Sequence, residues 1–144
     1  LQGMLLSFMS DSHGNFFIGT ANNVRLVPPA LLRTGRWNSM FHVDLPNKRS
    51  REAMIKHYAK VWGVSLDQPL PNMSEWTGAE IEQCFQQAGT MDMTLLEAAA
   101  FICPISVTMK EEINFVRGWS RDKARPSELP DDASEMAAGG RKIE

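Results

Sequence analysis

Three side chains between positions 22 and 36 have the chemistry needed to hold a phosphate group: Asn22, Arg33 and Arg36. An asparagine amide donates to a phosphate oxygen and accepts from water, while a guanidinium is always charged and planar and bridges two phosphate oxygens. Simpler interpretations exist for each. Asn22-Asn23 alone favours a turn after a strand, and two arginines around Gly35 favour a solvated turn. Residue type by itself leaves both interpretations open.

The sequence has no loop that could cradle a triphosphate. No G-x-x-x-x-G-K-[ST] segment occurs, so neither loop amides nor a loop lysine are available to the β- and γ-phosphates. Asp44 is the only acidic residue that closes an apolar strand, and Leu45-Pro46 follows it where a Walker B strand would have a glutamate. We therefore expect the isolated chain neither to bind ATP tightly nor to hydrolyse it.

Composition and charge give no reason to expect nucleic acid, a membrane or a metal ion as a partner. The chain has 144 residues, of which 43% are hydrophobic and 22% charged, with a formal charge of -2, so nothing general favours nucleic acid or a membrane as partner. Cys84 and Cys103 lack metal-site spacing and are expected to be reduced core thiols, while His13, His42 and His57 are too dispersed for a metal site. No apolar run approaches the ~20 residues that span a bilayer. A cytoplasmic protein is expected.

The N-terminal third predicts two strands. Residues 16–20 are a short apolar run bounded by turn formers, and residues 40–45 alternate until Pro46 removes a backbone donor. Pro28-Pro29 predicts the start of a short helix between them. A helix without a capping residue is expected at the very start, which indicates a truncated chain. Its apolar stripe is Leu1, Met4, Leu5, Phe8 and Met9.

The rest of the chain predicts helices. Residues 48–62 carry one apolar stripe that Gly63 ends. Three capping boxes predict further helix starts, because a threonine hydroxyl and a glutamate three residues later satisfy each other's amides. These pairs are Thr77 with Glu80, Thr94 with Glu97, and Thr108 with Glu111. The expected buried face of the first of these helices is Ile81, Cys84, Phe85 and Ala88. From about Ser120 the composition is too polar to offset ordering entropy, which predicts a flexible tail.

Four segments occur in an order that is typical of one family. They are Thr20-Ala21-Asn22, Pro28-Pro29-Ala30-Leu31-Leu32-Arg33-Thr34-Gly35-Arg36-Trp37, Phe41-His42-Val43-Asp44-Leu45-Pro46 and Gly78-Ala79-Glu80-Ile81-Glu82-Gln83. Their order and spacing resemble the AAA+ ATPases over roughly residues 1–120. Residues 104–109 and 124–127 resemble the C-terminal end of the bacterial and plastid Ycf46 type.

The resemblance implies an α/β fold. We expect the last two strands of a P-loop NTPase α/β/α domain with its helices, followed by an α-helical lid. The implied organisation is the C-terminal part of the nucleotide-binding core at residues 1–46, the lid at 47–120 and a flexible tail at 121–144.

The same resemblance implies roles for individual residues. Asn22 matches sensor 1, the amide that orients the water attacking the γ-phosphate. Arg33 and Arg36 match the arginine fingers, which reach into a neighbouring subunit's site and stabilise charge on the transferring phosphoryl group. Gly78 and Ala79 match the start of the sensor-2 helix, whose amides and dipole face the nucleotide. That position lacks an arginine, so we expect the lid to act through backbone and packing. No metal ligand is implied.

For the whole protein, the resemblance implies an oligomeric ring, expected to be hexameric, that uses ATP and Mg2+ to remodel a macromolecule. At the level of the family, the expected substrate is a protein. Neither a membrane nor a specific nucleic acid is implied as a partner. A second hypothesis is a non-catalytic module that joins AAA+ rings as arginine-finger donor or inhibitor. A third is a small helical binding domain in which the motif arose by chance.

Overall fold

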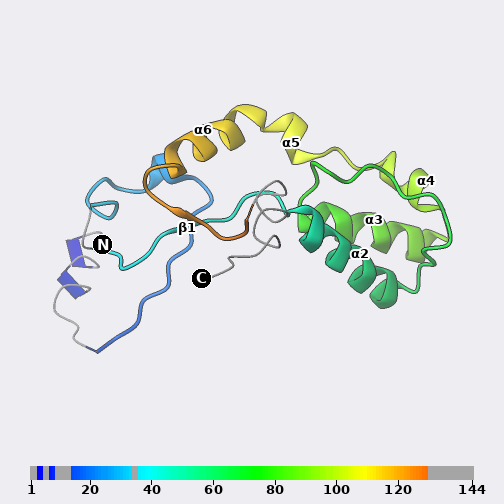
Figure 1. Cartoon of the computed structure of the whole chain (residues 1–144), viewed down its shortest axis with the longest axis horizontal. Coiled ribbons are helices and arrows are strands. Elements are labelled where there is room, and N and C mark those ends of the chain that lie inside the picture. The colour runs from blue at the N-terminus through cyan, green and yellow to red at the C-terminus, as the bar shows by residue number, and fades with distance from the viewer. Residues whose placement is uncertain (1–2, 5–6, 9–13, 34–35, 130–144) are drawn as a thin grey trace, which may run out of the picture.

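The computed structural model describes residues 3–4, 7–8, 14–33 and 36–129. Figure 1 shows two lobes joined by the strand β1 (Phe41–His42) and the chain that follows it. We call residues 14–33 and 36–42 the N-terminal lobe, and residues 48–102 the helical lobe. Helices α5 (Ile105–Thr108) and α6 (Lys110–Ser120) run from the helical lobe back across the N-terminal lobe.

The helical lobe begins with α2 (Lys48–Trp62), which has the bounds that the apolar stripe predicts. The side chain of its N-cap residue Asn47 accepts a hydrogen bond of 2.9 Å from the Ser50 amide. The helix ends at Gly63, whose φ of 65° lies in the left-handed region that glycine adopts without strain. Both ends of this helix are therefore fixed by single residues that the sequence displays.

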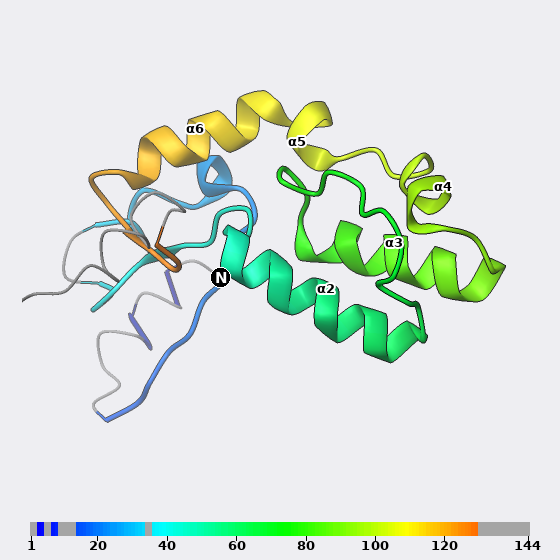
Figure 2. The same cartoon turned by 45° about the vertical axis from the view of Figure 1, so that its right-hand side comes forward.

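Helices α3 (Gly78–Met91) and α4 (Leu95–Ala99) start at two of the three predicted capping boxes, those of Thr77 and Thr94. Figure 2 shows α2 and α3 side by side. The third prediction is wrong. Thr108 is the last residue of α5, and its hydroxyl donates to the Ile105 carbonyl at 3.4 Å. A capping residue needs extended backbone, and α5 holds Thr108 in a helical conformation instead.

The core of the helical lobe lies between α2, α3 and α4. The predicted buried face of α3 is confirmed, and Leu95 of α4 closes it with no exposed surface. Ten buried hydrophobic residues form this cluster: Ala59, Met73, Trp76, Ile81, Cys84, Phe85, Ala88, Leu95, Ala98 and Ile102. Burial raises the pKa of the Cys84 thiol to about 11. Cys103, in contrast, is exposed, so the prediction of a core thiol is wrong there.

The N-terminal lobe differs from its prediction. Residues 16–20 are not a strand, and Phe16 and Ile18 are 89% and 82% exposed. A strand forms only against a partner that takes up its backbone hydrogen bonds, and the described residues place none beside this segment. After Pro28-Pro29 the chain makes a single turn rather than a helix, with the amides of Leu31 and Leu32 donating to the carbonyls of the two prolines.

Of the two strands that the N-terminal third predicts, the second forms within its predicted range as β1, and its partner comes from residues 125–126. β1 is shorter than the predicted strand at 40–45, and it pairs with β2 (Arg125–Pro126) in a two-stranded parallel sheet. Thus the α/β fold class is confirmed, as a helix-rich chain with one small parallel sheet. β2 lies within the expected flexible tail at 121–144, and β1 supplies the partners for its backbone hydrogen bonds. The flexibility of the tail stays a prediction. Residues 130–144 lie outside the described residues.

Two findings concern the chain ends and the membrane. The described residues of the expected first helix, 3–4 and 7–8, are helical, whereas Leu1, Leu5 and Met9 lie outside the described part. Across the described residues, no helix has both the length and the apolar character that crossing a bilayer requires.

Candidate functional site

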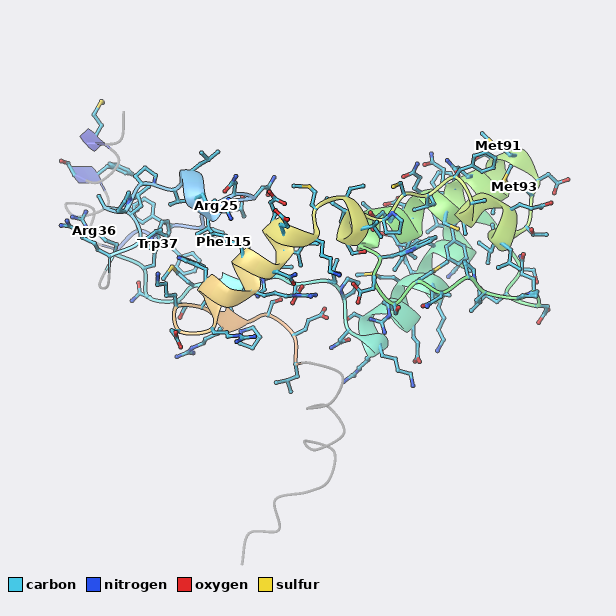
Figure 3. All side chains as sticks on the ribbon, turned by 90° about the horizontal axis from the view of Figure 1, so that it is seen from above. Arg25, Arg36, Trp37, Met91, Met93 and Phe115 are labelled. Carbon is cyan, nitrogen blue, oxygen red and sulfur yellow. The ribbon has the colours of Figure 1, made fainter. Side chains whose placement is uncertain are left out.

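Asn22 lies exposed at a bend directly before the single 3-10 turn η1 (Val24–Leu26). The side chain of Asn23 caps this turn by accepting from the Arg25 amide at 2.9 Å. The Arg25 guanidinium in turn stacks over the Phe115 ring of α6, 3.9 Å from its centroid, as Figure 3 shows. The bend that presents Asn22 is thus tied to α6, while the Asn22 side chain itself faces solvent.

The two arginines lie on either side of a tight turn. The Arg36 amide donates to the Arg33 carbonyl at 3.3 Å; Thr34 and Gly35, between them, lie outside the described residues. Arg33 is exposed, whereas Arg36 is half-buried and its Nη1 is a buried donor without an acceptor in the described structure. An unpaired buried donor costs free energy, and an acceptor from outside the chain would reach this nitrogen only if the turn moved.

Trp37 anchors the turn that carries the arginines. Its indole Nε1 donates to the Leu31 carbonyl at 2.8 Å. Its ring packs on Gly19 so closely that a Cβ at that position would lie 3.1 Å from the ring. The arginine turn is therefore held against the segment that contains Asn22, which places the three predicted residues in one lobe.

Gly78 and Ala79 form the first turn of α3, in the other lobe. The capping box satisfies the amides around them: the Thr77 amide donates to Glu80 Oε2 at 2.7 Å, and the Glu80 amide donates to Thr77 Oγ1 at 3.3 Å. The amides of Gly78 and Ala79 themselves have no acceptor among the described residues. Two free donors at a helix start favour an anion, but the Glu80 carboxylate beside them opposes a second negative charge.

The structure does not bring the two sets of predicted residues together. Within the described part, no hydrogen bond or ion pair joins the N-terminal lobe residues Asn22, Arg33 and Arg36 to the start of α3. Figure 3 shows Arg36 at one end of the molecule and the far end of α3, marked by Met91, at the other. A single chain therefore presents two separate surfaces rather than one assembled site.

An ion pair that sequence reasoning missed lies near the junction of the lobes. Arg117 of α6 holds Asp44 through two nitrogens, with Nε 2.7 Å from Oδ2 and Nη2 2.9 Å from Oδ1. Burial raises the pKa of Asp44, but hydrogen bonds from Arg117 and the Leu45 amide outweigh it, so the pKa lies below its usual 3.8. The partners are 73 residues apart, and no local signal predicts such a pair.

Arg117 also lines two neighbouring cavities, of about 310 and 260 Å3. The first lies beneath α5 and α6 and includes Ser106 and Lys110, and the second lies beside Asp44 and Glu128. No group of three or more histidine, cysteine, aspartate or glutamate side chains in the described part is arranged to hold a metal ion.

Comparison with known proteins identifies similar chains. The chain is 29% identical over 88% of its length to an uncharacterized AAA domain-containing protein ycf46 of Pyropia yezoensis, and 27% identical over 82% to that of Guillardia theta. It spans only 29% and 26% of the lengths of these two relatives. A probable inactive ATP-dependent zinc metalloprotease, FTSHI 1 of Arabidopsis thaliana chloroplasts, is 37% identical over 52% of this chain and 8% of its own.

Neither a family model nor a solved structure matches the chain. The two relatives at 27–29% identity match most of the chain, and both are named AAA domain-containing proteins. The ATP-dependent zinc metalloproteases FtsH match about half of it, for example 56% in Mesomycoplasma conjunctivae at 33% identity.

Proposed function

We propose that this chain supplies the arginine fingers, sensor 1 and lid of an AAA+ ATPase. The proposal rests on its homology to AAA domain-containing proteins of the Ycf46 type. In this proposal the subunits assemble into a hexameric ring that couples ATP hydrolysis to remodelling of a macromolecule. Arg33 and Arg36 act on the nucleotide of the neighbouring subunit. Asn22 orients water, and the start of α3 faces the nucleotide of its own subunit.

The observation that carries this proposal is the presentation of the arginine turn. Arg33 is exposed, and Trp37 anchors the turn that holds Arg33 and Arg36. Figure 3 shows Arg36 of this turn at the opposite end of the molecule from Met91, the last residue of α3. A planar guanidinium that is held in place suits phosphate oxygens, and among the described residues no carboxylate pairs with Arg33 or Arg36.

The residues of this chain fit only the edges of a nucleotide site. The free amides of Gly78 and Ala79 can face a phosphate, but no Walker A loop is present to cradle one, so the chain alone does not fit ATP and Mg2+. When bound in the complete site, Mg-ATP would supply the anhydride that is hydrolysed. We propose that the nucleotide-binding core and the lid meet at residues 46–47, where Pro46 gives way to the N-cap of α2.

A chimera tests the proposal, with this chain in place of the matched stretch of the Pyropia yezoensis relative. Its steady-state ATP hydrolysis is compared with that of the unmodified relative, which sets the reference. Arg33→Ala is expected to lower kcat by about 10³-fold or more, because the charge on the transferring phosphoryl group loses its stabilising cation. Arg33→Lys should restore only a small part, since a point charge does not replace the planar fork.

The matched control is Arg49→Ala, an exposed arginine in the first turn of α2 that is expected to leave hydrolysis unchanged. Ring assembly is followed by light scattering for every variant. An Arg33→Ala chimera that forms rings and hydrolyses ATP at the parent rate would remove Arg33 from the mechanism.

One finding favours the alternative of a non-catalytic module. The Arabidopsis thaliana relative at 37% identity over 52% of this chain is named a probable inactive ATP-dependent zinc metalloprotease. On that alternative, the chimera hydrolyses no ATP, while the isolated chain added to an active ring changes its rate and Arg33→Ala abolishes the change. The two proposed functions therefore differ in where Arg33 is required. An ATPase subunit requires it in the chimera that hydrolyses ATP, whereas a non-catalytic module requires it in the isolated chain that is added to an active ring.

A further inference from the structure

We infer that residues 125–129 form a strap that fixes the angle between the N-terminal lobe and the helical lobe. The strap follows α6 and returns to the junction between the lobes, where it contacts both of them (Figure 1). The polar composition of the strap does not predict a fixed conformation. The contacts that the strap makes with the two lobes must therefore hold it in place.

On the N-terminal lobe, the strap binds through its backbone. The Arg125 amide donates to the Met40 carbonyl and the Ser127 amide donates to the His42 carbonyl, both at 2.9 Å. This pairing is the parallel sheet of β1 and β2. The first half of the strap is therefore attached to the last residues before the junction.

On the helical lobe, the strap binds the start of α2 through Glu128. One carboxylate oxygen accepts from the Asn47 amide at 3.1 Å, and the other accepts from the Ser50 hydroxyl at 2.8 Å. The Asn47 side chain also donates to the Leu129 carbonyl at 3.0 Å. The N-cap residue of α2 is thus held by the strap on both its backbone and its side chain.

The charges at the start of α2 explain why a distant glutamate binds there. The first turn of this helix contains no acidic residue, and it carries the cations Lys48 and Arg49 beside the positive end of the helix dipole. An acidic group in that position is stabilising. Glu128 supplies it from 78 to 81 residues further along the chain, and so closes a loop that contains the whole helical lobe.

The Asp44–Arg117 pair adds a second tie at the same junction, since it joins the residues before α2 to α6. Together the strap and this pair hold residues 40–50 on two sides. The angle between the lobes sets the position of the arginine turn relative to the start of α3. The importance of that position for ATP hydrolysis rests on the proposed function. The strap itself does not depend on it.

Pulsed electron spin resonance on the isolated chain tests the strap. Nitroxides are attached at Ser39→Cys and Lys60→Cys, both exposed and on opposite lobes, with Cys103→Ser removing the exposed native thiol. The chain with Glu128 is expected to give one narrow distance distribution. Glu128→Gln should broaden it and shift its mean, and should speed hydrogen exchange at the amides of Asn47 and Ser127, because the charged acceptor is lost.

Two further variants keep the test decisive. Ser127→Pro removes the donor to His42 and should broaden the distribution without touching α2. Glu112→Gln, exposed on α6, is the charge-matched control and should change nothing. Far-ultraviolet circular dichroism, which the helices dominate, reports whether the helical lobe stays folded. A distribution that stays narrow in both strap variants overturns the inference. No nucleotide is used, so this result and the chimera's ATPase result can fail separately.

Discussion

The two lobes of this chain bury their apolar side chains to very different degrees. The helical lobe encloses Ile81, Phe85 and Leu95 with no exposed surface, whereas the N-terminal lobe leaves Phe16 and Ile18 more than four-fifths exposed. The helices of the helical lobe and the segment at residues 16–20 are both rich in apolar residues. The difference is that helices pair their own backbone groups and then pack, whereas a strand needs a neighbour before its side chains can be buried.

The comparison predicts that large apolar residues contribute to stability in one lobe only. Phe85→Ala should lower the free energy of unfolding by about 3–5 kcal/mol, because it empties a closed core. Phe16→Ala, the matched control, should change it by less than about 0.5 kcal/mol. Urea denaturation followed by far-ultraviolet circular dichroism measures both. Equal losses would contradict the division into a packed and an unpacked lobe.

Close helix packing within the helical lobe gives the next largest effect. A Cβ at Gly89 of α3 would lie 2.5 Å from the Trp62 carbonyl oxygen, so Gly89→Ala should cost about 1–3 kcal/mol through displacement of backbone. Gly118 of α6 has nothing within 4 Å of that position. Gly118→Ala should therefore stabilise by up to about 1 kcal/mol through helix propensity. The same denaturation curves give the two signs, and a stabilising Gly89→Ala would show that α2 and α3 pack less closely.

The smallest effect concerns the tie between the lobes. The folded pKa of Asp44 is lowered, so its contribution to stability is full above the unfolded pKa, about 4, and disappears as the pH falls through the lower folded value. Both side chains are more than a third exposed, at 38% and 39%, which limits the pair to about 1 kcal/mol or less. Asp44→Asn should remove that part of the acid dependence. If Asp44→Asn left the slope of stability against pH below about 4 unchanged, the ion pair between Asp44 and Arg117 would make no contribution to stability.

The sequence predicted the helical lobe well because its signals are local. Gly63 ends α2, and Thr77 and Thr94 begin α3 and α4, each within one helical turn of the groups it satisfies. Thr108 misled because the same threonine-to-glutamate spacing also fits the end of one short helix and the start of the next. Strand prediction at 16–20 failed for lack of a pairing partner, which apolar content does not reveal.

The candidate site was predicted in part. The motif located the arginine turn, and its anchor Trp37 belongs to the same segment. Contacts between residues far apart in the sequence were missed, above all Asp44 with Arg117 and Glu128 with the start of α2. Such pairs form only when the chain after α6 returns to the junction between the lobes. The polar residues of that part of the chain show no sequence pattern that predicts this return. The roles of Asn22, Arg33 and Arg36 stay predictions.

Mixing two inactive chimeric subunits tests the central claim most directly. One carries Arg33→Ala and Arg36→Ala, and the other is inactivated in the ATP-binding loop contributed by the relative. Each alone should hydrolyse no ATP, but mixed rings should regain hydrolysis, because an intact arginine turn then faces an intact loop across a subunit interface. If mixed rings form and remain inactive while the parent chimera hydrolyses ATP, the arginines do not act between subunits and the account is contradicted.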